Sequence, residues 1–410
     1  MVATRTFEQV CDELDRRRHV TLGLERIQSL LDLLGHPEES LRVVQVVGTN
    51  GKGTTAVALA AALQEAGLAA GTYLSPHVLS YTERMMIRGD YVSEEQFAGV
   101  MDRVMEAADE GGVPASQFEL LTAGALRLFH EANVEWAVME AGLGARYDAT
   151  TAAKPEAVVL TNVGLDHTEY LGNTFGKIAR EKLASLPGGG ILIVGDENPE
   201  IVGIAREECK RAGTRLVEAD SSPNYGLSDR TVSFAGRNVL LGVRAAEELL
   251  DRPFGPQVRE RVARQVEGVL PGRFEVYELD GIPVIVDGGH NPGGLEVALA
   301  GVRETYGDRP LGIVFGVLRD KDIGSMLTAL ETEASHLVLT RPDNERAAAP
   351  EWVVEHYGPR DLEDRLAEVT VDVSEAVDGA VSEMKRTNGV VLVTGSLYTG
   401  AAVLRRLRES

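Results

Sequence analysis

One short segment constrains this chain more than any other. Residues 41–47 are a short run rich in β-branched valine, residues 48–53 are Gly-Thr-Asn-Gly-Lys-Gly, and residues 54–66 are rich in Ala and Leu. This order predicts a strand, a glycine-rich turn and a helix. In such a turn backbone N–H groups can surround an anion, the helix N-terminus attracts it, and Lys52 adds a positive charge. The segment, called the phosphate loop below (residues 46–55), therefore predicts phosphate binding by an α/β protein.

The phosphate loop departs from the common G-x-x-x-x-G-K-[ST] pattern. Val46 stands at the first glycine position, and Gly53 follows the lysine. A hydroxyl of Thr54 or Thr55 is then the group that can reach Mg²⁺ or a phosphate oxygen. The alternative is an ordinary glycine-rich turn between a strand and a helix.

The rest of the chain alternates apolar strands with helical stretches. Further strands are expected at 135–139, 156–160 and 191–194, which predicts a parallel sheet flanked by helices. A Pro/Gly break near 268–273 precedes a second series of strands, expected at 274–279, 284–286, 312–315, 336–339 and 390–393. We therefore predict an ATP-binding-type domain over 1–270 and a smaller, Rossmann-like α/β domain over 271–410.

Composition excludes several kinds of partner. Lys plus Arg is 41 and Asp plus Glu is 63, so the formal net charge is −22 and nucleic acid or an anionic membrane is not expected to bind. Cys11 and Cys209 are too far apart in sequence to indicate a disulfide framework or a thiolate metal site. Neither a signal peptide nor a membrane-spanning helix is expected from the apolar runs of this sequence. A cytoplasmic monomer is the expectation.

The phosphate loop also resembles a known family. Its Gly-Thr-Asn-Gly-Lys-Gly-Thr run is similar to the ATP loop of folylpolyglutamate synthases and dihydrofolate synthases, within the Mur ligase superfamily. The resemblance extends over nearly the whole chain, including the segments 72–84, 139–150, 164–172 and 179–182. It implies ATP and Mg²⁺ as cofactors. The ATP contacts that it implies in this segment are Asn50, Gly51, Lys52, Gly53 and Thr54.

The resemblance implies a metal site as well. Its ligands are Ser75, Glu140 and His167, and Lys182 corresponds to a lysine that the family carbamylates with CO₂. From the residues alone, a solvated loop carboxylate, a hydrogen-bonding loop histidine and a solvated helix lysine are the alternatives. The chain departs from the family motif at Ala145, where Gly is usual, and at Thr151, where Asn is usual.

Other positions match the family more locally. The resemblance implies that Asn238, Arg273 and Asp287 contact ATP and that His290 is needed for activity. Helix capping, a linker and a strand-end turn are the alternatives. Two more segments, 316–322 and 394–398, match motifs of the second domain. On the folate side, the residues implied are Ser116, Phe118 and Tyr147.

The implied function is an ATP-dependent amide ligase. It would join L-glutamate to a pteroate or folate acid: dihydropteroate, a tetrahydrofolate, or both. The alternatives are polyglutamylation alone, a Mur-type ligase for another carboxylate, and a P-loop NTPase that has no amino-acid substrate.

Overall fold

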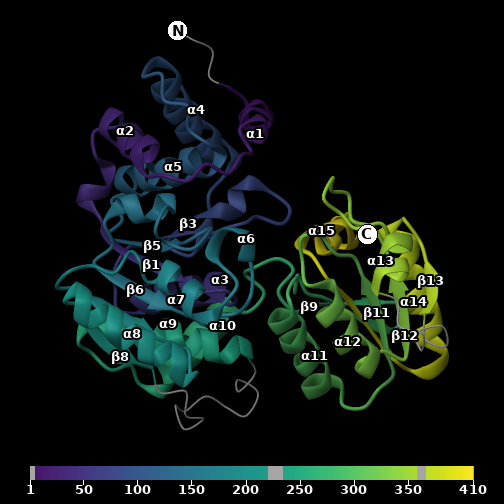
Figure 1. Ribbon diagram of the computed structural model, residues 1–410. Coiled ribbons are helices and arrows are strands. Elements are labelled where there is room, and N and C mark those ends of the chain that lie inside the picture. The colour runs from purple at the N-terminus through teal and green to yellow at the C-terminus, as the bar shows by residue number, and fades with distance from the viewer. Residues whose placement is uncertain (1–4, 220–233, 358–365, 410) are drawn as a thin grey trace. The chain divides into compact units, whose positions relative to one another are not determined.

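The computed structural model describes residues 5–219, 234–357 and 366–409. The chain divides into two compact units, Met1–Glu267 and Gly268–Ser410. Each has its own sheet and its own layers of helices (Figure 1). The α/β class expected from the alternation of strands and helices is confirmed.

An eight-stranded sheet forms the centre of the first unit, in the order β4-β3-β2-β5-β1-β6-β7-β8. The strands from β2 to β8 along this order are parallel, whereas β3 and β4 are antiparallel additions at one edge. The strands are β1 (Arg42–Val47), β2 (Ala70–Tyr73), β3 (Met85–Ile87), β4 (Asp90–Tyr91), β5 (Trp136–Glu140), β6 (Ala157–Leu160), β7 (Ile191–Val194) and β8 (Arg215–Glu218).

Two apolar clusters pack against one face of this sheet, and they lie beside different strands. One cluster joins β2 and β5 to α1, α2, α4 and α5, and the other joins β6 and β7 to α7 and α8. The helix α3 packs against β1, β2 and β5, and α9 and α10 pack on α3 (Figure 1). The helices are α1 (Phe7–Arg16), α2 (Glu25–Leu33), α3 (Lys52–Glu65), α4 (Glu94–Glu110), α5 (Gln117–Glu131), α6 (Thr168–Leu171), α7 (Phe175–Lys182), α8 (Pro199–Ala212), α9 (Phe234–Leu250) and α10 (Pro256–Val266), with 3₁₀ turns η1 (Pro37–Ser40), η2 (Tyr81–Arg84) and η3 (Ala149–Ala153).

The second unit has a six-stranded sheet in the order β13-β12-β11-β14-β10-β9. All neighbours are parallel except β9, which pairs antiparallel with β10. Residues of α11, α12 and α13 form the core cluster against the sheet, and α14 and α15 also pack on its strands. The elements are β9 (Glu275–Leu279), β10 (Ile282–Val286), α11 (Pro292–Tyr306), β11 (Leu311–Phe315), α12 (Ile323–Glu333), β12 (His336–Leu339), α13 (Pro350–Tyr357), β13 (Leu366–Val369), α14 (Val373–Thr387), β14 (Val390–Thr394) and α15 (Leu397–Glu409).

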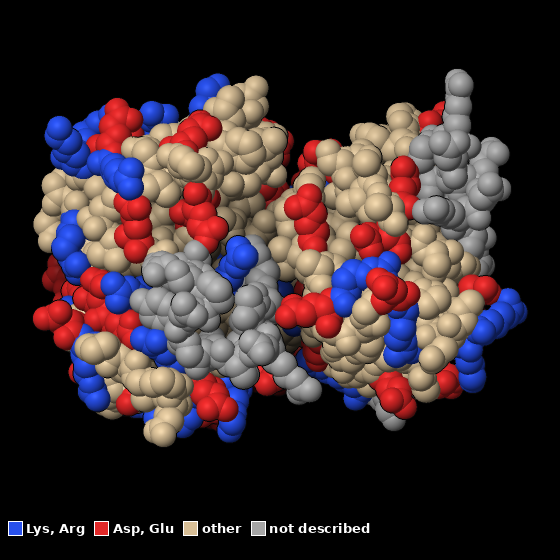
Figure 2. Space-filling view, turned by 90° about the horizontal axis from the view of Figure 1, so that it is seen from below, with Lys and Arg blue, Asp and Glu red and all other residues tan. Residues whose placement is uncertain are grey.

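The charged side chains are dispersed. On the face seen in Figure 2, acidic and basic side chains alternate over each unit instead of gathering by sign. Within the described part of the chain, no helix has the length and apolar character needed to cross a membrane.

Candidate active site

The phosphate loop connects β1 to α3 at the carboxyl end of the sheet. Two of its glycines adopt backbone angles that a side chain would oppose: φ is 151° at Gly48 and 80° at Gly51. A Cβ atom on Gly48 would lie 1.8 Å from the hydroxyl of Thr161, and one on Gly51 would lie 2.3 Å from the amide of Asn238. The loop is therefore enclosed by neighbouring segments as closely as glycine permits.

The segment after β6 holds the phosphate loop in place. The Asn50 carbonyl accepts hydrogen bonds from the Thr161 hydroxyl (2.7 Å) and the Asn162 amide (2.9 Å), and the Asn50 N–H donates to Asn162 Oδ1 (3.0 Å). Farther along, the Gly164 N–H donates to Thr49 Oγ1 over 2.9 Å. Sequence analysis missed Thr161 and Asn162 as supports of the loop. Their signal was present, because they follow the strand next to β1, and the carboxyl ends of parallel strands share one edge.

The two candidate hydroxyls at the start of α3 differ in access. Thr55 is fully buried, and its hydroxyl has no hydrogen-bond partner within the described structure. Thr54 is partly exposed. Of the two, Thr54 is therefore the hydroxyl that a ligand of the phosphate loop can reach.

Lys52, Glu140 and Ser75 are brought together from three elements. The Lys52 Nζ lies 4.0 Å from Glu140 Oε1 and donates to the Thr49 carbonyl over 3.2 Å. The Ser75 N–H donates to Glu140 Oε2 over 3.0 Å. Glu140 is the last residue of β5 and is buried, with 5% of its surface exposed. A carboxylate and a hydroxyl are hard oxygen donors, so Glu140 and Ser75 fit a Mg²⁺ ion beside the phosphate loop.

His167 lies on the segment that also supports the phosphate loop. It is exposed, adopts a left-handed conformation (φ 49°) and directly precedes α6. Its backbone N–H donates to Asp166 Oδ1 over 2.9 Å. This segment follows β6 and bonds to Thr49 through Gly164, which places His167 at the same edge of the sheet as the loop.

Lys182 ends α7 with its side chain directed inwards. It is buried, with 5% of its surface exposed, and its Nζ donates to the Gly48 carbonyl over 2.5 Å. Burial, assisted by the positive charge of Lys52, lowers the pKa of Lys182 to about 7, although Asp166 and Asp148 oppose the shift. The amine is thus held against the phosphate loop in a setting that favours its neutral form.

The loop between β5 and η3 (residues 141–148) folds around a buried carboxylate. Asp148 Oδ2 accepts the N–H groups of Gly142 (2.8 Å) and Leu143 (2.9 Å), and Oδ1 accepts the N–H of Thr150 (3.0 Å). Burial raises the pKa of Asp148, and the hydrogen bonds from Thr150, Leu143 and Gly142 oppose that rise. The loop that follows Glu140 is therefore held in one conformation by the hydrogen bonds of Asp148.

The residues expected on the folate side have different surroundings. The Ser116 hydroxyl caps α5 and donates to Glu119 Oε2 over 2.7 Å, so its observed contacts are those of a helix cap. The centre of the Phe118 ring lies 5.9 Å from the centre of the Tyr73 ring. A Cβ atom added to Gly142 would lie only 2.8 Å from the Phe118 ring. Tyr147 is 49% exposed. Phe118 and Tyr147 thus lie beside and on the loop that follows Glu140.

In the second unit, Asp287 organises the turn after β10. Its carboxylate accepts the N–H groups of Phe274 and Gly289, each over 2.9 Å. Burial raises the pKa of Asp287, against the opposing charge of Arg273. The His290 ring nitrogen Nδ1 bonds to the Gly288 carbonyl over 3.0 Å. Arg273 itself is exposed.

Of the two other second-domain motifs, 394–398 contacts that turn and 316–322 contacts 394–398. The Gly395 N–H donates to the Gly289 carbonyl over 3.0 Å, and the Gly316 N–H donates to the Thr394 carbonyl over 3.1 Å. The strands β11, β14 and β10 are neighbours, so their carboxyl ends place these turns side by side.

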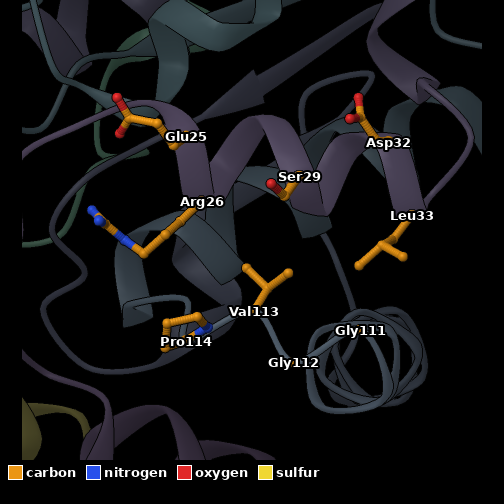
Figure 3. A pocket seen from close by; sticks show the side chains of 9 residues that line it. All are labelled: Glu25, Arg26, Ser29, Asp32, Leu33, Gly111, Gly112, Val113 and Pro114. Carbon is orange, nitrogen blue, oxygen red and sulfur yellow. The ribbon is translucent and has the colours of Figure 1, made fainter.

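A separate pocket lies between α2 and the segment joining α4 to α5 (Figure 3). Its volume is about 550 Å³, and α2 contributes Arg26 to its lining while the segment joining α4 to α5 contributes Val113. Ser116, Phe118 and Tyr147 are not among the residues lining it, which are Glu25, Arg26, Ser29, Asp32, Leu33, Gly111, Gly112, Val113 and Pro114.

Comparison with known proteins gives two matching domain families. Residues 46–225 match the Mur ligase middle domain, and residues 272–397 match the Mur ligase glutamate ligase domain. The dihydrofolate synthase/folylpolyglutamate synthase of Bacillus subtilis (strain 168) is 31% identical over 422 aligned positions, which cover 94% of this chain and 95% of the relative.

Solved structures agree with that likeness over the whole chain. E. coli FolC in complex with DHPP and ADP is similar with a TM-score of 0.87 and 28% identity, covering 100% of this chain and 99% of FolC. A bifunctional folylpolyglutamate synthase/dihydrofolate synthase with Mn, AMPPNP and L-glutamate bound is similar with a TM-score of 0.81 and 28% identity, covering 99% of each chain.

Proposed function

Because this chain belongs to the dihydrofolate synthase/folylpolyglutamate synthase family of Mur ligases, we propose that it is an ATP- and Mg²⁺-dependent ligase that joins L-glutamate to a folate-type acid. We propose both dihydropteroate and tetrahydrofolate as acceptors. The observation that carries the proposal is the joint placement of Lys52, Glu140 and Ser75 at the phosphate loop. Similar solved structures, matched over at least 99% of each chain, contain ADP in one case and Mn, AMPPNP and L-glutamate in another.

The reaction follows from the chemistry of a carboxylate. Carboxylate and amine do not condense in water, because oxide is a poor leaving group. In the proposed reaction an acceptor carboxylate oxygen bonds to the γ-phosphorus of ATP, the bond to the bridging oxygen breaks, and ADP leaves. The glutamate amine then bonds to the acyl carbon of the acyl phosphate. Phosphate leaves, the nitrogen gives up a proton, and an amide remains.

The residues of the first unit have distinct proposed roles. Lys52 offsets the charge of the transferring phosphoryl group, and the backbone N–H groups of the phosphate loop orient it. The proposed ATP contacts in this unit are Asn50, Gly51, Lys52, Gly53, Thr54 and Asn238. Ser75, Glu140 and His167 are the proposed Mg²⁺ ligands. When bound, the ion supplies charge neutralisation between phosphate and carboxylate.

Lys182 is proposed to act as a carbamate. A neutral amine is the form that reacts with CO₂, and the surroundings of Lys182 lower its pKa to about 7. The carbamate carries a negative charge, which suits a position near Lys52 and a divalent ion. Phe118, Tyr147 and Ser116 are proposed to line the folate side.

The second unit is proposed to serve the amino-acid half of the reaction. We propose that residues 1–270 bind ATP and residues 271–410 form the glutamate-ligase domain, to which Arg273, Asp287 and His290 belong. Arg273 and Asp287 are proposed ATP contacts, and His290 is proposed to be required for activity. We also propose that the chain works as a monomer in the cytoplasm.

The deciding experiment measures phosphate release from ATP with purified protein, Mg²⁺ and L-glutamate. Dihydropteroate and tetrahydrofolate are offered in separate reactions, and mass spectrometry identifies the products. Glutamylated product from both acids supports the bifunctional proposal, whereas product from tetrahydrofolate alone limits the enzyme to polyglutamylation. ATP turnover that is indifferent to glutamate and to either acid would contradict a ligase.

A further inference from the structure

A buried glutamine occupies the middle of the central strand β1. Val43, Gln45 and Val47 alternate with their neighbours and so point to one face of the sheet. Val43 belongs to the apolar cluster beneath α1, α2, α4 and α5, and Val47 belongs to the cluster beneath α7 and α8. Gln45 lies between these two clusters and has no exposed surface. An apolar residue would avoid the cost of burying this amide, so its contacts are informative.

The Gln45 amide sets the direction of two hydroxyl groups. Its Nε2 donates to Thr150 Oγ1 over 2.7 Å and to Thr151 Oγ1 over 2.9 Å. Each hydroxyl carries a single proton, which is then free to be donated onward. The Thr150 hydroxyl donates to Asp148 Oδ1 over 2.5 Å, and the Thr151 hydroxyl donates to the Ala145 carbonyl over 2.6 Å. Thr151 and Ala145 are the two departures from the family motif, and here they contact one another.

This chain of hydrogen bonds leads to the residues after Glu140. Asp148 receives the Thr150 hydroxyl on one oxygen and the N–H groups of Gly142 and Leu143 on the other. The 141–148 loop is therefore held by hydrogen bonds at two points, Asp148 and the Ala145 carbonyl. Gln45 Nε2 donates to the threonine hydroxyl that makes each of these bonds. The other end of the Gln45 amide, Oε1, is buried and accepts no hydrogen bond within the described structure. A polar group that is only half satisfied in a core costs stability, and such costs are retained mainly where function needs them.

We propose that Gln45 is a positioning residue for the 141–148 loop, which directly follows Glu140. Through Thr150 and Asp148 it holds the 141–148 loop so that Glu140 stays beside Ser75 and Lys52. The metal part of the inference rests on the proposed function, because it takes Glu140 as a ligand of the divalent ion. The mechanical part, that Gln45 holds the loop, stands independently.

The first test measures the loop directly. Gln45→Leu replaces the amide with an apolar side chain of similar size and so removes the donor. We expect peptides containing Gly142 and Leu143 to exchange their amide hydrogens about tenfold faster or more, as measured by mass spectrometry. The control is Leu63→Ala, which opens a cavity at a fully buried position of α3 that belongs to neither apolar cluster beside the loop. Unchanged exchange in Gln45→Leu, or equal acceleration by Leu63→Ala, would overturn the proposal.

A matched pair of variants at Thr150 tests the same proposal if the Gln45 variant does not fold. Thr150→Ser keeps the hydroxyl, whereas Thr150→Val has nearly the same shape without it. We expect Thr150→Val to accelerate exchange at Gly142 and Leu143 and Thr150→Ser to leave it near the unchanged level. Equal behaviour of the two variants contradicts a role for the hydroxyl.

The second test measures metal binding with Mn²⁺ and AMPPNP by following the free Mn²⁺ signal. Mutation of a residue that orients a metal ligand typically lowers metal affinity by about 10- to 100-fold. Gln45→Leu and Thr150→Val should therefore weaken Mn²⁺ binding by about tenfold. In the ligase assay, the Mg²⁺ needed for half-maximal rate should rise about tenfold, with kcat at saturating Mg²⁺ within about threefold. If the unchanged protein does not ligate glutamate, the proposed function fails. Exchange and Mn²⁺ binding still decide the role of Gln45.

Discussion

The side chain of Lys182 donates a hydrogen bond to the backbone carbonyl of Gly48 over 2.5 Å. This contact joins the end of α7 to the first residue after β1, more than a hundred positions away in the sequence. Burying a lysine side chain costs free energy of folding, so a buried lysine is expected mainly where the site uses it. Lys182 contacts the phosphate loop and feels the charges of Lys52, Asp148 and Asp166, so either an ammonium or a carbamate there would alter the local charge.

Replacing Lys182 with Ala should abolish most turnover and leave ATP binding mostly intact. The physical reason is that the side chain contacts the loop carbonyl of Gly48 and not an N–H group that would face a phosphate. A loss of at least about 100-fold in kcat is expected, with nucleotide affinity within about threefold. Phosphate release and nucleotide titration provide the two measurements.

The matched control for that prediction is Lys177→Ala, an exposed lysine on the same helix. If the active species is a carbamate, formate or acetate added to Lys182→Ala should restore part of the rate by supplying the missing anion. Full activity in Lys182→Ala without any addition would contradict the carbamate role.

The pKa of Lys182 predicts how stability depends on pH. Burial lowers this pKa from 10.5 to about 7, so between these values the unfolded chain binds one proton more than the folded chain. The free energy of unfolding of the unchanged protein, relative to Lys182→Met, should therefore rise with pH across this window and be constant below about pH 7. Urea unfolding at pH 6, 8 and 9.5 in CO₂-free buffer measures it. A difference that does not vary with pH would show that Lys182 is not buried as an amine.

The phosphate loop could be predicted because its signal is local. A strand, closely spaced glycines and a helix are all visible within residues 41–66, and the structure places Gly48 and Gly51 in conformations that favour glycine. The parallel sheets followed from the same alternation of strands and helices. The antiparallel strands β3 and β4 were not predicted, because strands of three and two residues carry too little periodicity.

The supports of the site were not predictable from local pattern. Gln45 appears in the sequence as one polar residue inside an apolar strand, and its partners Thr150 and Thr151 are more than a hundred positions away. The inward direction of Lys182 is similar, since a lysine that ends a helix is ordinarily solvated. Only the assembled sheet places β1 next to β5 and β6 and the segments that follow them, and these long-range contacts depend on that arrangement.

Glu140 offers a test that separates charge from geometry. In Glu140→Gln the amide oxygen can still accept the Ser75 N–H, but the negative charge facing Lys52 and a divalent ion is lost. We expect the rate at limiting Mg²⁺ to fall by at least about tenfold, with partial recovery at high Mg²⁺. Glu135→Gln is the control, because Glu135 precedes the same strand and its side chain also accepts a backbone N–H, that of Ala69, over 3.1 Å. Equal losses in both variants would indicate a structural effect.

Gly51→Ala tests how tightly the phosphate loop is enclosed. Gly51 has φ 80°, and an added Cβ would lie 2.3 Å from the Asn238 amide, so both strain and a clash are expected. Nucleotide affinity should fall by at least about tenfold, measured by titration with ADP. Gly67→Ala is the matched control: φ is 90°, but nothing lies within 4 Å of the added atom, so it carries the strain without the clash. Nucleotide affinity should be unchanged there.

A double variant identifies the clash with Asn238 as the cause. In Gly51→Ala combined with Asn238→Ala, the amide that the new methyl group meets is removed. The combined loss of nucleotide affinity should therefore be smaller than the product of the two single losses, because neighbouring residues that share one space are not additive. Strict additivity would mean that the Cβ on Gly51 acts through backbone strain alone, and Gly67→Ala would then show how much of the loss such strain explains.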